Sequence, residues 1–298
     1  MTGLGQLIRR NCKLFFKDKG MFFSSLITPL ILLILYVTFL GRIYRDSFAS
    51  ALPEGFSVDP SLIDATVAGQ LISSLLAVCC VTVAFCSNLL MVQDRVSGAR
   101  RDLTVSPVRS STLALAYFAA SSIATLIVNF AALGACLGYL ALSDCWYMTG
   151  QDVLLLMLDV FLLTLFGVAL SSCLHVFLST NGQGSAVGTI VSAGYGFICG
   201  AYMPISNFSD GLQKVLSFLP GTYGTSLLRN HALSGAFDSM AEAGFPEEVV
   251  ENIRISIDCS LTFFGHPVPV GVMYAVLGGS ILLFVGLYVL INCLRSKT

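Results

Sequence analysis

The sequence contains few charged residues for its length. Of 298 residues, 16 are Lys or Arg and 17 are Asp or Glu, together 11% of the chain, whereas about 25% is usual in soluble domains. Hydrophobic residues make up 55%, and the mean hydropathy is +0.83. Several apolar stretches reach the roughly 20 residues that a helix needs to cross a bilayer. The composition excludes an ordinary soluble domain and predicts an all-α polytopic membrane protein.

Motifs for catalysis and nucleotide binding are missing. The chain has no Gly-x-x-x-x-Gly-Lys-Ser/Thr phosphate-binding loop, and no Gly-x-Ser-x-Gly, His-Glu-x-x-His or Cys-x-x-Cys. Its three histidines, His175, His231 and His266, lack metal-ligand spacing. We therefore expect no catalytic residue, no metal and no cofactor on this chain, and no nucleic-acid partner. If ATP drives its function, ATP and Mg²⁺ must bind to another polypeptide.

Most of the ten cysteines lie in apolar runs, where a thiol is typically a small apolar side chain. Cys145 and Cys259 are exceptions, because both fall in segments predicted to be external. They could form a disulfide, and the sequence leaves their pairing open.

The chain is predicted to form a single transmembrane domain over residues 1–298. Residues 1–20 form a basic amphipathic helix that lies in the membrane interface. Six apolar stretches are predicted to cross the membrane, at 22–40, 65–92, 112–142, 153–178, 184–203 and 271–292. Residues 204–269 form the largest segment between spans and are predicted to be external, and nothing resembles a cleavable signal peptide.

Basic residues gather at one side of this predicted topology. The segments placed in the cytoplasm contain eleven basic residues (Arg9, Arg10, Lys13, Lys17, Lys19, Arg95, Arg100, Arg101, Arg109, Arg295 and Lys297) and three acidic ones (Asp18, Asp94 and Asp102). The external segments contain five basic residues (Arg42, Arg45, Lys214, Arg229 and Arg254) against thirteen acidic ones. Because cytoplasmic loops are enriched in Lys and Arg, we expect both termini in the cytoplasm and a location in the plasma membrane.

The loop at 93–109 is the most polar stretch between two spans. It is long enough for about two helical turns and includes Pro107, before which a helix usually ends. A loop that only reverses the chain could be shorter and uncharged. We interpret it as a short cytosolic helix that is presented to another protein.

This loop resembles the cytosolic loop of permease subunits of ABC-type exporters, the type-2 permease family. The matching positions are Asp94, Arg95, Gly98, Leu103, Val105, Ser106 and Pro107. Two departures stand out, since Val96 replaces a second acid and Ala99-Arg100-Arg101 replaces Thr-Leu-Glu. The resemblance implies that the loop couples the chain to an ATPase through Asp94, Arg95, Gly98, Arg100, Arg101, Asp102, Leu103 and Pro107.

Two further stretches resemble the same family. One is the N-terminus, with its basic interfacial helix, the pair Lys17-Asp18, and Pro29 within the first span. The other runs from Met203-Pro204-Ile205 through Leu219-Pro220 and Tyr223 to Arg229. In the second stretch, Leu212, Val215, Leu216 and Leu219 share one helix face, which predicts a half-buried helix. The resemblance implies external re-entrant helices between spans 5 and 6.

The resemblance also implies partners and a function. It predicts an ATP-driven exporter in which this subunit pairs with a second copy of itself or a homologous permease, above separate ATPase subunits. The first, second and fifth spans would line the path, in contact with membrane lipids. The substrate stays open among drugs, peptides, lipids and lipid-linked glycans, and the apolar spans favour an amphipathic cargo.

The predicted fifth span has small residues at every fourth position. These are Gly184, Gly188, Ser192, Gly196 and Gly200. Such spacing lets two helices approach closely, and the resemblance places this face at or near the dimer interface. With 27 glycines in the chain, the spacing could also be incidental.

Three polar residues fall inside predicted spans. Asp159 is a carboxylate inside a predicted span, and such a residue is by default a functional candidate. The alternatives are that its side chain reaches outward, that it pairs with an external Arg, or that it lies beyond the true span boundary. Asn88 and Asn129 fit hydrogen bonds between helices better than substrate contacts. Asp159 leaves a rival function open, an ion- or proton-coupled secondary transporter, although the chain lacks the internal repeat typical of those folds. A non-transporting membrane scaffold is the third alternative.

Overall fold

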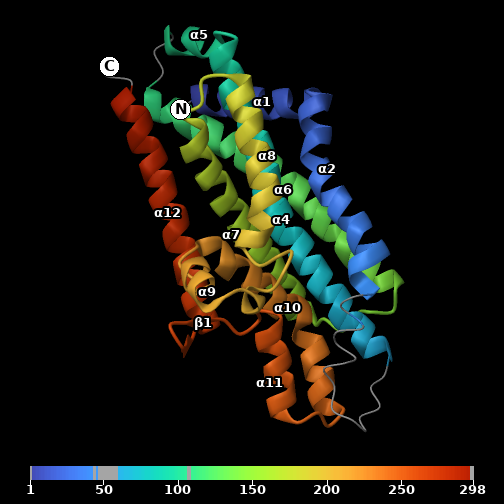
Figure 1. The fold of residues 1–298 in the computed structure, drawn as a ribbon. Helices are drawn as coiled ribbons and strands as arrows, with labels where there is room; N and C mark the ends of the chain where they lie inside the picture. Colours follow the sequence, from blue (N-terminus) through green and yellow to red (C-terminus); the bar gives the residue numbers. More distant parts are fainter. Residues whose placement is uncertain (1, 43–44, 46–59, 106–108, 296–298) are drawn as a thin grey trace.

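The computed structural model describes residues 2–42, 45, 60–105 and 109–295 (Figure 1). Within these ranges the regular elements are helices joined by turns and short loops, apart from a small hairpin near the C-terminal end. The helices are α1 (Thr2–Lys17), α2 (Lys19–Leu35), α4 (Pro60–Val96), α5 (Ala99–Val105), α6 (Ser110–Leu142), α7 (Gly150–His175), α8 (Asn181–Ile198), α9 (Asp210–Leu216), α10 (Pro220–Glu242), α11 (Glu247–Ser256) and α12 (Val270–Arg295). Tyr36–Leu40 forms a π-helical turn, Ile205–Asn207 a 3₁₀ turn, and β1 (Thr262–Phe263) pairs antiparallel with β2 (His266–Pro267).

Four described helices are long and apolar enough to cross a membrane: α4, α6, α7 and α12. α1 and α2 would provide a fifth span if this pair, bent by 71°, counts as one. α8 has 18 residues, about 27 Å at 1.5 Å per residue, but its many Gly, Ser and Asn residues make it less apolar than the four. The all-α polytopic architecture is confirmed, and the count of six spans stays a prediction.

α4 is the central helix, and most of the others pack against it. In its most apolar window 89% of the residues are buried, compared with 17% in α12. α2, α6, α7, α8 and α10 all contact it. Gly167 of α7 permits a close approach of the two backbones, because a Cβ there would lie 2.7 Å from the carbonyl oxygen of Cys80 in α4.

α4 also extends beyond the predicted span. It begins at Pro60 and continues to Val96, so the first residues of the predicted loop belong to the helix. The short helix predicted next is present as α5, after a turn at Gly98, whose φ of 83° suits glycine. The predicted fifth span is wrong at its end, since α8 stops at Ile198 and Gly200 adopts a φ of 76°.

The N-terminal helices meet at a defined break. Asp18 caps α2, accepting a hydrogen bond of 3.0 Å from the backbone N–H of Met21, and Pro29 is accommodated inside that helix. α1 runs across the end of the bundle near α5 and packs against α6 (Figure 1). Its position in a membrane interface stays a prediction.

The segment at 204–269 is more deeply integrated than a surface loop. α10 is buried along most of its length and packs against α4, α7 and α12. α11 begins after Pro246 with Glu247 and Glu248 in its first turn, as expected from the favourable interaction of acids with a helix N-terminus.

The predicted apolar face at 212–219 is mostly wrong. Leu216 is buried, but Leu212 and Val215 are exposed, as is Leu219. The hydroxyl of Thr222 donates to the carbonyl of Leu216 at 2.9 Å. This hydrogen bond holds one edge of α9 against α10. The described chain leaves the rest of the apolar face of α9 uncovered.

Candidate functional site

The tip of the α4–α5 connection projects from one end of the bundle (Figure 1). Arg101 and Asp102 are exposed there. Two apolar residues, Val96 and Val105, are exposed beside them, Val105 by 88%. Pro107 lies outside the described residues. This tip combines both signs of charge with apolar surface, which suits contact with a protein partner.

Asp94, at the base of the tip, is a buried residue rather than a surface one. It is 5% exposed. The Arg10 guanidinium donates two hydrogen bonds to its carboxylate, at 2.7 and 2.9 Å, and the Tyr117 hydroxyl donates a third at 2.6 Å. Asp94 therefore joins α1 and α6 to the end of α4.

Three more residues of the predicted coupling set point toward the bundle. Arg95 donates to the backbone carbonyl of Leu178, just after α7. Arg100 donates to the side-chain oxygen of Asn292 in α12 at 3.0 Å, and Leu103 packs against the buried cluster that includes Met91 and Tyr288. The loop thus has an outer face for contact and an inner face bonded to α7 and α12. The sequence pattern did not separate these two faces.

The small-residue stripe of α8 does not form one uniform face. Gly184 packs against Leu89 of α4, and Gly196 is covered by the ring of Tyr202. The Tyr202 hydroxyl also donates to the carbonyl of Ser192 at 3.1 Å. Gly188 has open space around it, and Gly200 lies beyond the helix. Within the subunit only part of the stripe is used for close packing.

Asp159 contacts neither an arginine nor solvent. It is 1% exposed. One carboxylate oxygen lies 2.5 Å from Nδ1 of His231 in α10, and the other accepts a 2.6 Å hydrogen bond from the Tyr274 hydroxyl in α12. Asp159 thus joins α7 to α10 and α12, a set of partners that the sequence pattern did not predict.

The two asparagines link helices, as expected. The Asn88 amide donates to the Ser172 hydroxyl in α7 at 3.2 Å, and its oxygen accepts from the Ser121 hydroxyl in α6 at 2.8 Å. The Asn129 amide in α6 donates to the Thr164 hydroxyl in α7 at 2.8 Å. Both lie at helix–helix contacts inside the subunit.

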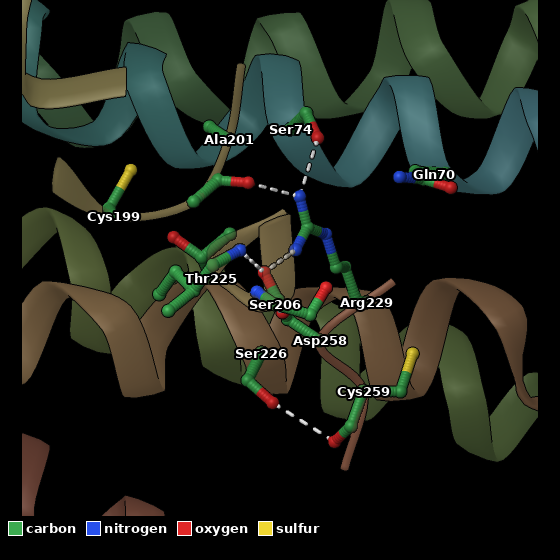
Figure 2. Close-up of polar contacts among 12 residues, drawn as sticks. Gln70, Ser74, Cys199, Ala201, Ser206, Thr225, Ser226, Arg229, Asp258 and Cys259 are labelled. Carbon is green, nitrogen blue, oxygen red and sulfur yellow. Dashed lines mark hydrogen bonds and ion pairs between the residues drawn. The ribbon is translucent and has the colours of Figure 1, made fainter. Parts of the chain in front are cut away.

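A buried ion pair holds the segment at 204–269 against the spans (Figure 2). Arg229 of α10 is fully buried and donates to Asp258 at 3.1 Å, to the Ser74 hydroxyl of α4 at 3.3 Å, and to the carbonyl of Gly200. Asp258 also accepts from the backbone N–H groups of Ile205 and Ser206. Two oppositely charged groups thereby connect α4, α10, the end of α8 and the chain after α11.

The pKa of Asp258 is affected both by burial and by the groups that bond to its carboxylate. Burial raises the pKa of Asp258, while Arg229 and the two backbone N–H groups act in the opposite direction. Both residues belong to a segment predicted to be external, and both are buried against other parts of the chain rather than exposed. The family resemblance singled out Arg229 but gave no signal for Asp258.

The described residues contain no group of three or more His, Cys, Asp or Glu placed to hold a metal ion. Cys145 and Cys259 are both free thiols, so the open disulfide of the sequence analysis is not formed in this structure. Asp94, Asp159 and Arg229 are each bonded to a charged or titratable side chain elsewhere in the chain.

Comparison with known protein families gives one match. The family model described as ABC-2 type transporter matches residues 2–232, which run from α1 to the first half of α10 and leave α11 and α12 outside the match. No curated protein matches the sequence. Together with the apolar helices, the match makes the chain a multi-pass membrane protein and confirms its resemblance to this family. The chain belongs to the ABC-2 type transporter family, which provides the transmembrane component of ABC transporters.

Proposed function

We propose that this chain is the permease subunit of an ATP-driven exporter in the plasma membrane. It works with a second permease subunit, either another copy or a homologue, and both of its termini lie in the cytoplasm. ATP and Mg²⁺ bind to a separate ATPase subunit, which docks on the α5 tip. The observation that carries the proposal is the division of this tip into an exposed face and an inner face bonded to α1, α6, α12 and the chain just after α7.

The inner contacts supply a route by which motion of the tip could reach the bundle. Asp94 ties its base to α1 and α6, Arg95 bonds to the end of α7, and Arg100 bonds to α12. A partner that moves α5 would pull on these helices together. Such coupling needs contacts that differ between two states, and hydrogen bonds at helix ends can provide them.

The test changes only the outer face of the tip. Arg101→Glu combined with Val105→Asp should lower the ATPase activity that co-purifies with the chain about tenfold, because a reversed charge and a buried acid oppose docking. Lys214→Glu, an exposed change on α9, is the control. Unchanged co-purified ATPase activity in the tip variant, at equal membrane levels, would remove this loop from the interface.

A further inference from the structure

A large cavity opens between α2, α4 and α6, away from the tip and from the buried ion pairs. Its volume is about 700 Å³, within the roughly 300–1,000 Å³ typical of ligand sites. Its walls are mainly apolar and include Leu33 of α2, Ile72 of α4 and Ala135 of α6. We call this cavity the α2–α4–α6 groove. α4 packs against both α2 and α6, and the end of α6 and the start of α4 lie near the end of α2 (Figure 1).

The length of the groove matches one leaflet of a bilayer. Its lining runs from Leu26 in α2 to Tyr36, the first residue of the π-helical turn, and from Asp64 to Leu75 along α4. At 1.5 Å per residue these stretches are about 15 and 16 Å long. One leaflet contributes about half of the roughly 30 Å hydrocarbon core. The groove therefore extends about as far as an acyl chain of one leaflet does.

One end of the groove is polar and carries excess positive charge. This mouth is lined by Arg42, Arg45 and Asp64, and Arg45 forms an ion pair with Asp64. Arg42 is exposed and has no ion pair within the described part of the chain. Asp144 precedes the lining residue Cys145 but does not itself line the groove. Among the described residues that line the mouth, two arginines and one aspartate leave one positive charge where the apolar walls end.

We propose that the α2–α4–α6 groove binds an anionic phospholipid of the bilayer. The acyl chains occupy the apolar walls, and the phosphate lies at the mouth beside Arg42. A neutral apolar ligand would make no use of Arg42, and a small soluble anion would make no use of 15 Å of apolar wall. This binding goes beyond the proposed function and needs no ATPase subunit.

The experiment is native mass spectrometry of the full-length protein in detergent. The protein is equilibrated with phosphatidylglycerol or phosphatidylcholine of identical acyl chains, or with glycerol 3-phosphate alone. We expect phosphatidylglycerol to bind about fivefold more tightly than phosphatidylcholine, as one basic residue near an anionic headgroup typically allows. Glycerol 3-phosphate should neither bind nor compete.

Two variants, each with a matched control, locate the lipid. Ala135→Phe fills the groove from an exposed position on α6 and should lower the affinity for both lipids at least tenfold, whereas Ala141→Phe, exposed on the same helix but outside the groove, should not. Arg42→Glu should abolish the preference for phosphatidylglycerol and leave phosphatidylcholine binding intact, and Lys214→Glu should keep the preference. Circular dichroism and gel filtration show that each variant is folded.

Three results would overturn the proposal. Equal binding by Ala135→Phe and Ala141→Phe would place the lipid elsewhere on the protein. Equal affinity for the two lipids in the unmodified protein would remove the role of Arg42. Competition by glycerol 3-phosphate would indicate a site for the soluble anion rather than for a lipid.

Discussion

Charged residues of similar appearance in the sequence have opposite roles in this fold. Asp94 and Asp102 both belong to the polar loop predicted from the sequence, yet Asp94 is buried against Arg10 and Asp102 is exposed. The same holds for Arg229, which lies in a segment predicted to be external and is fully buried. Whether a charged residue has a structural role can be judged only from its partner. That partner can be more than 80 residues away in the sequence, as for Arg10 and Asp94.

The first prediction concerns Arg10. Arg10→Ala removes two of the three side-chain hydrogen bonds to the buried carboxylate of Asp94 and leaves the one from the Tyr117 hydroxyl. The substitution should lower the free energy of unfolding by about 1–3 kcal/mol. Because the Arg10 side chain is 32% exposed, we expect a value near the lower end of this range. Arg9→Ala, an exposed neighbour on α1, should change stability by less than about 0.5 kcal/mol. Thermal unfolding in detergent measures both, and equal melting temperatures would show that the pair contributes nothing.

The second prediction concerns Arg229. Arg229→Met removes the cation that is paired with the buried carboxylate of Asp258 and should cost about 3–5 kcal/mol. Adding Asp258→Asn to this variant should restore part of the loss, because no buried charge then lacks a partner. Limited proteolysis of the segment at 204–269, together with thermal unfolding, reports the effect. A double variant that is no more stable than Arg229→Met would indicate that the two charges are not coupled.

At the scale of elements, α8 differs most from what its sequence pattern suggested. A spacing of four predicts a continuous small-residue face, but part of that face is covered by Leu89 and Tyr202 of the same subunit. Residues around Gly188 remain open, and Ile190 and Phe197 are exposed. The pattern alone could not distinguish packing within the subunit from packing between subunits, because both require small side chains.

The third prediction tests whether the open part of the small-residue stripe of α8 lies between two subunits. Gly188→Leu has space within the subunit, so the monomer should stay folded, but the added side chain should separate two copies and lower the dimer fraction about fivefold. Gly194→Leu also meets open space and lies off the stripe, which makes it the matched control. Crosslinking in membranes measures the dimer fraction. If the two variants dimerise equally well, the stripe is not at the interface.

At the scale of the whole molecule, the architecture could be predicted from the sequence better than the local contacts could. Hydropathy located the long helices, and the length of the polar loop at 93–109 together with Pro107 predicted the short helix that is present as α5. The boundaries of α4 and α8 were missed because helices continue past the apolar stretch or end early at a left-handed residue such as Gly200. The hydrogen bonds and ion pairs of Asp94, Asp159 and Arg229 could not be predicted, because each depends on partners that only the tertiary fold brings close.

The fourth prediction concerns topology. Cys at Ser97 and at Ala243, on a background without other cysteines, should be labelled by impermeant reagents from opposite sides of the membrane. Both positions are exposed, near the tip and after α10 respectively. The excess of basic residues around Ser97 predicts that this position lies in the cytoplasm. Labelling of both from the same side would contradict the proposed arrangement of spans.

The claim on which the proposed function depends is that an ATPase subunit docks on the α5 tip. Photo-crosslinking from position 105 in native membranes, with Val105 replaced by a photoreactive amino acid, tests it directly, since this side chain is 88% exposed. We predict a crosslink to a soluble polypeptide that carries a Gly-x-x-x-x-Gly-Lys-Ser/Thr loop, and none from position 215 in α9. A crosslink to that ATPase from position 215, or only to lipid from position 105, would contradict the account.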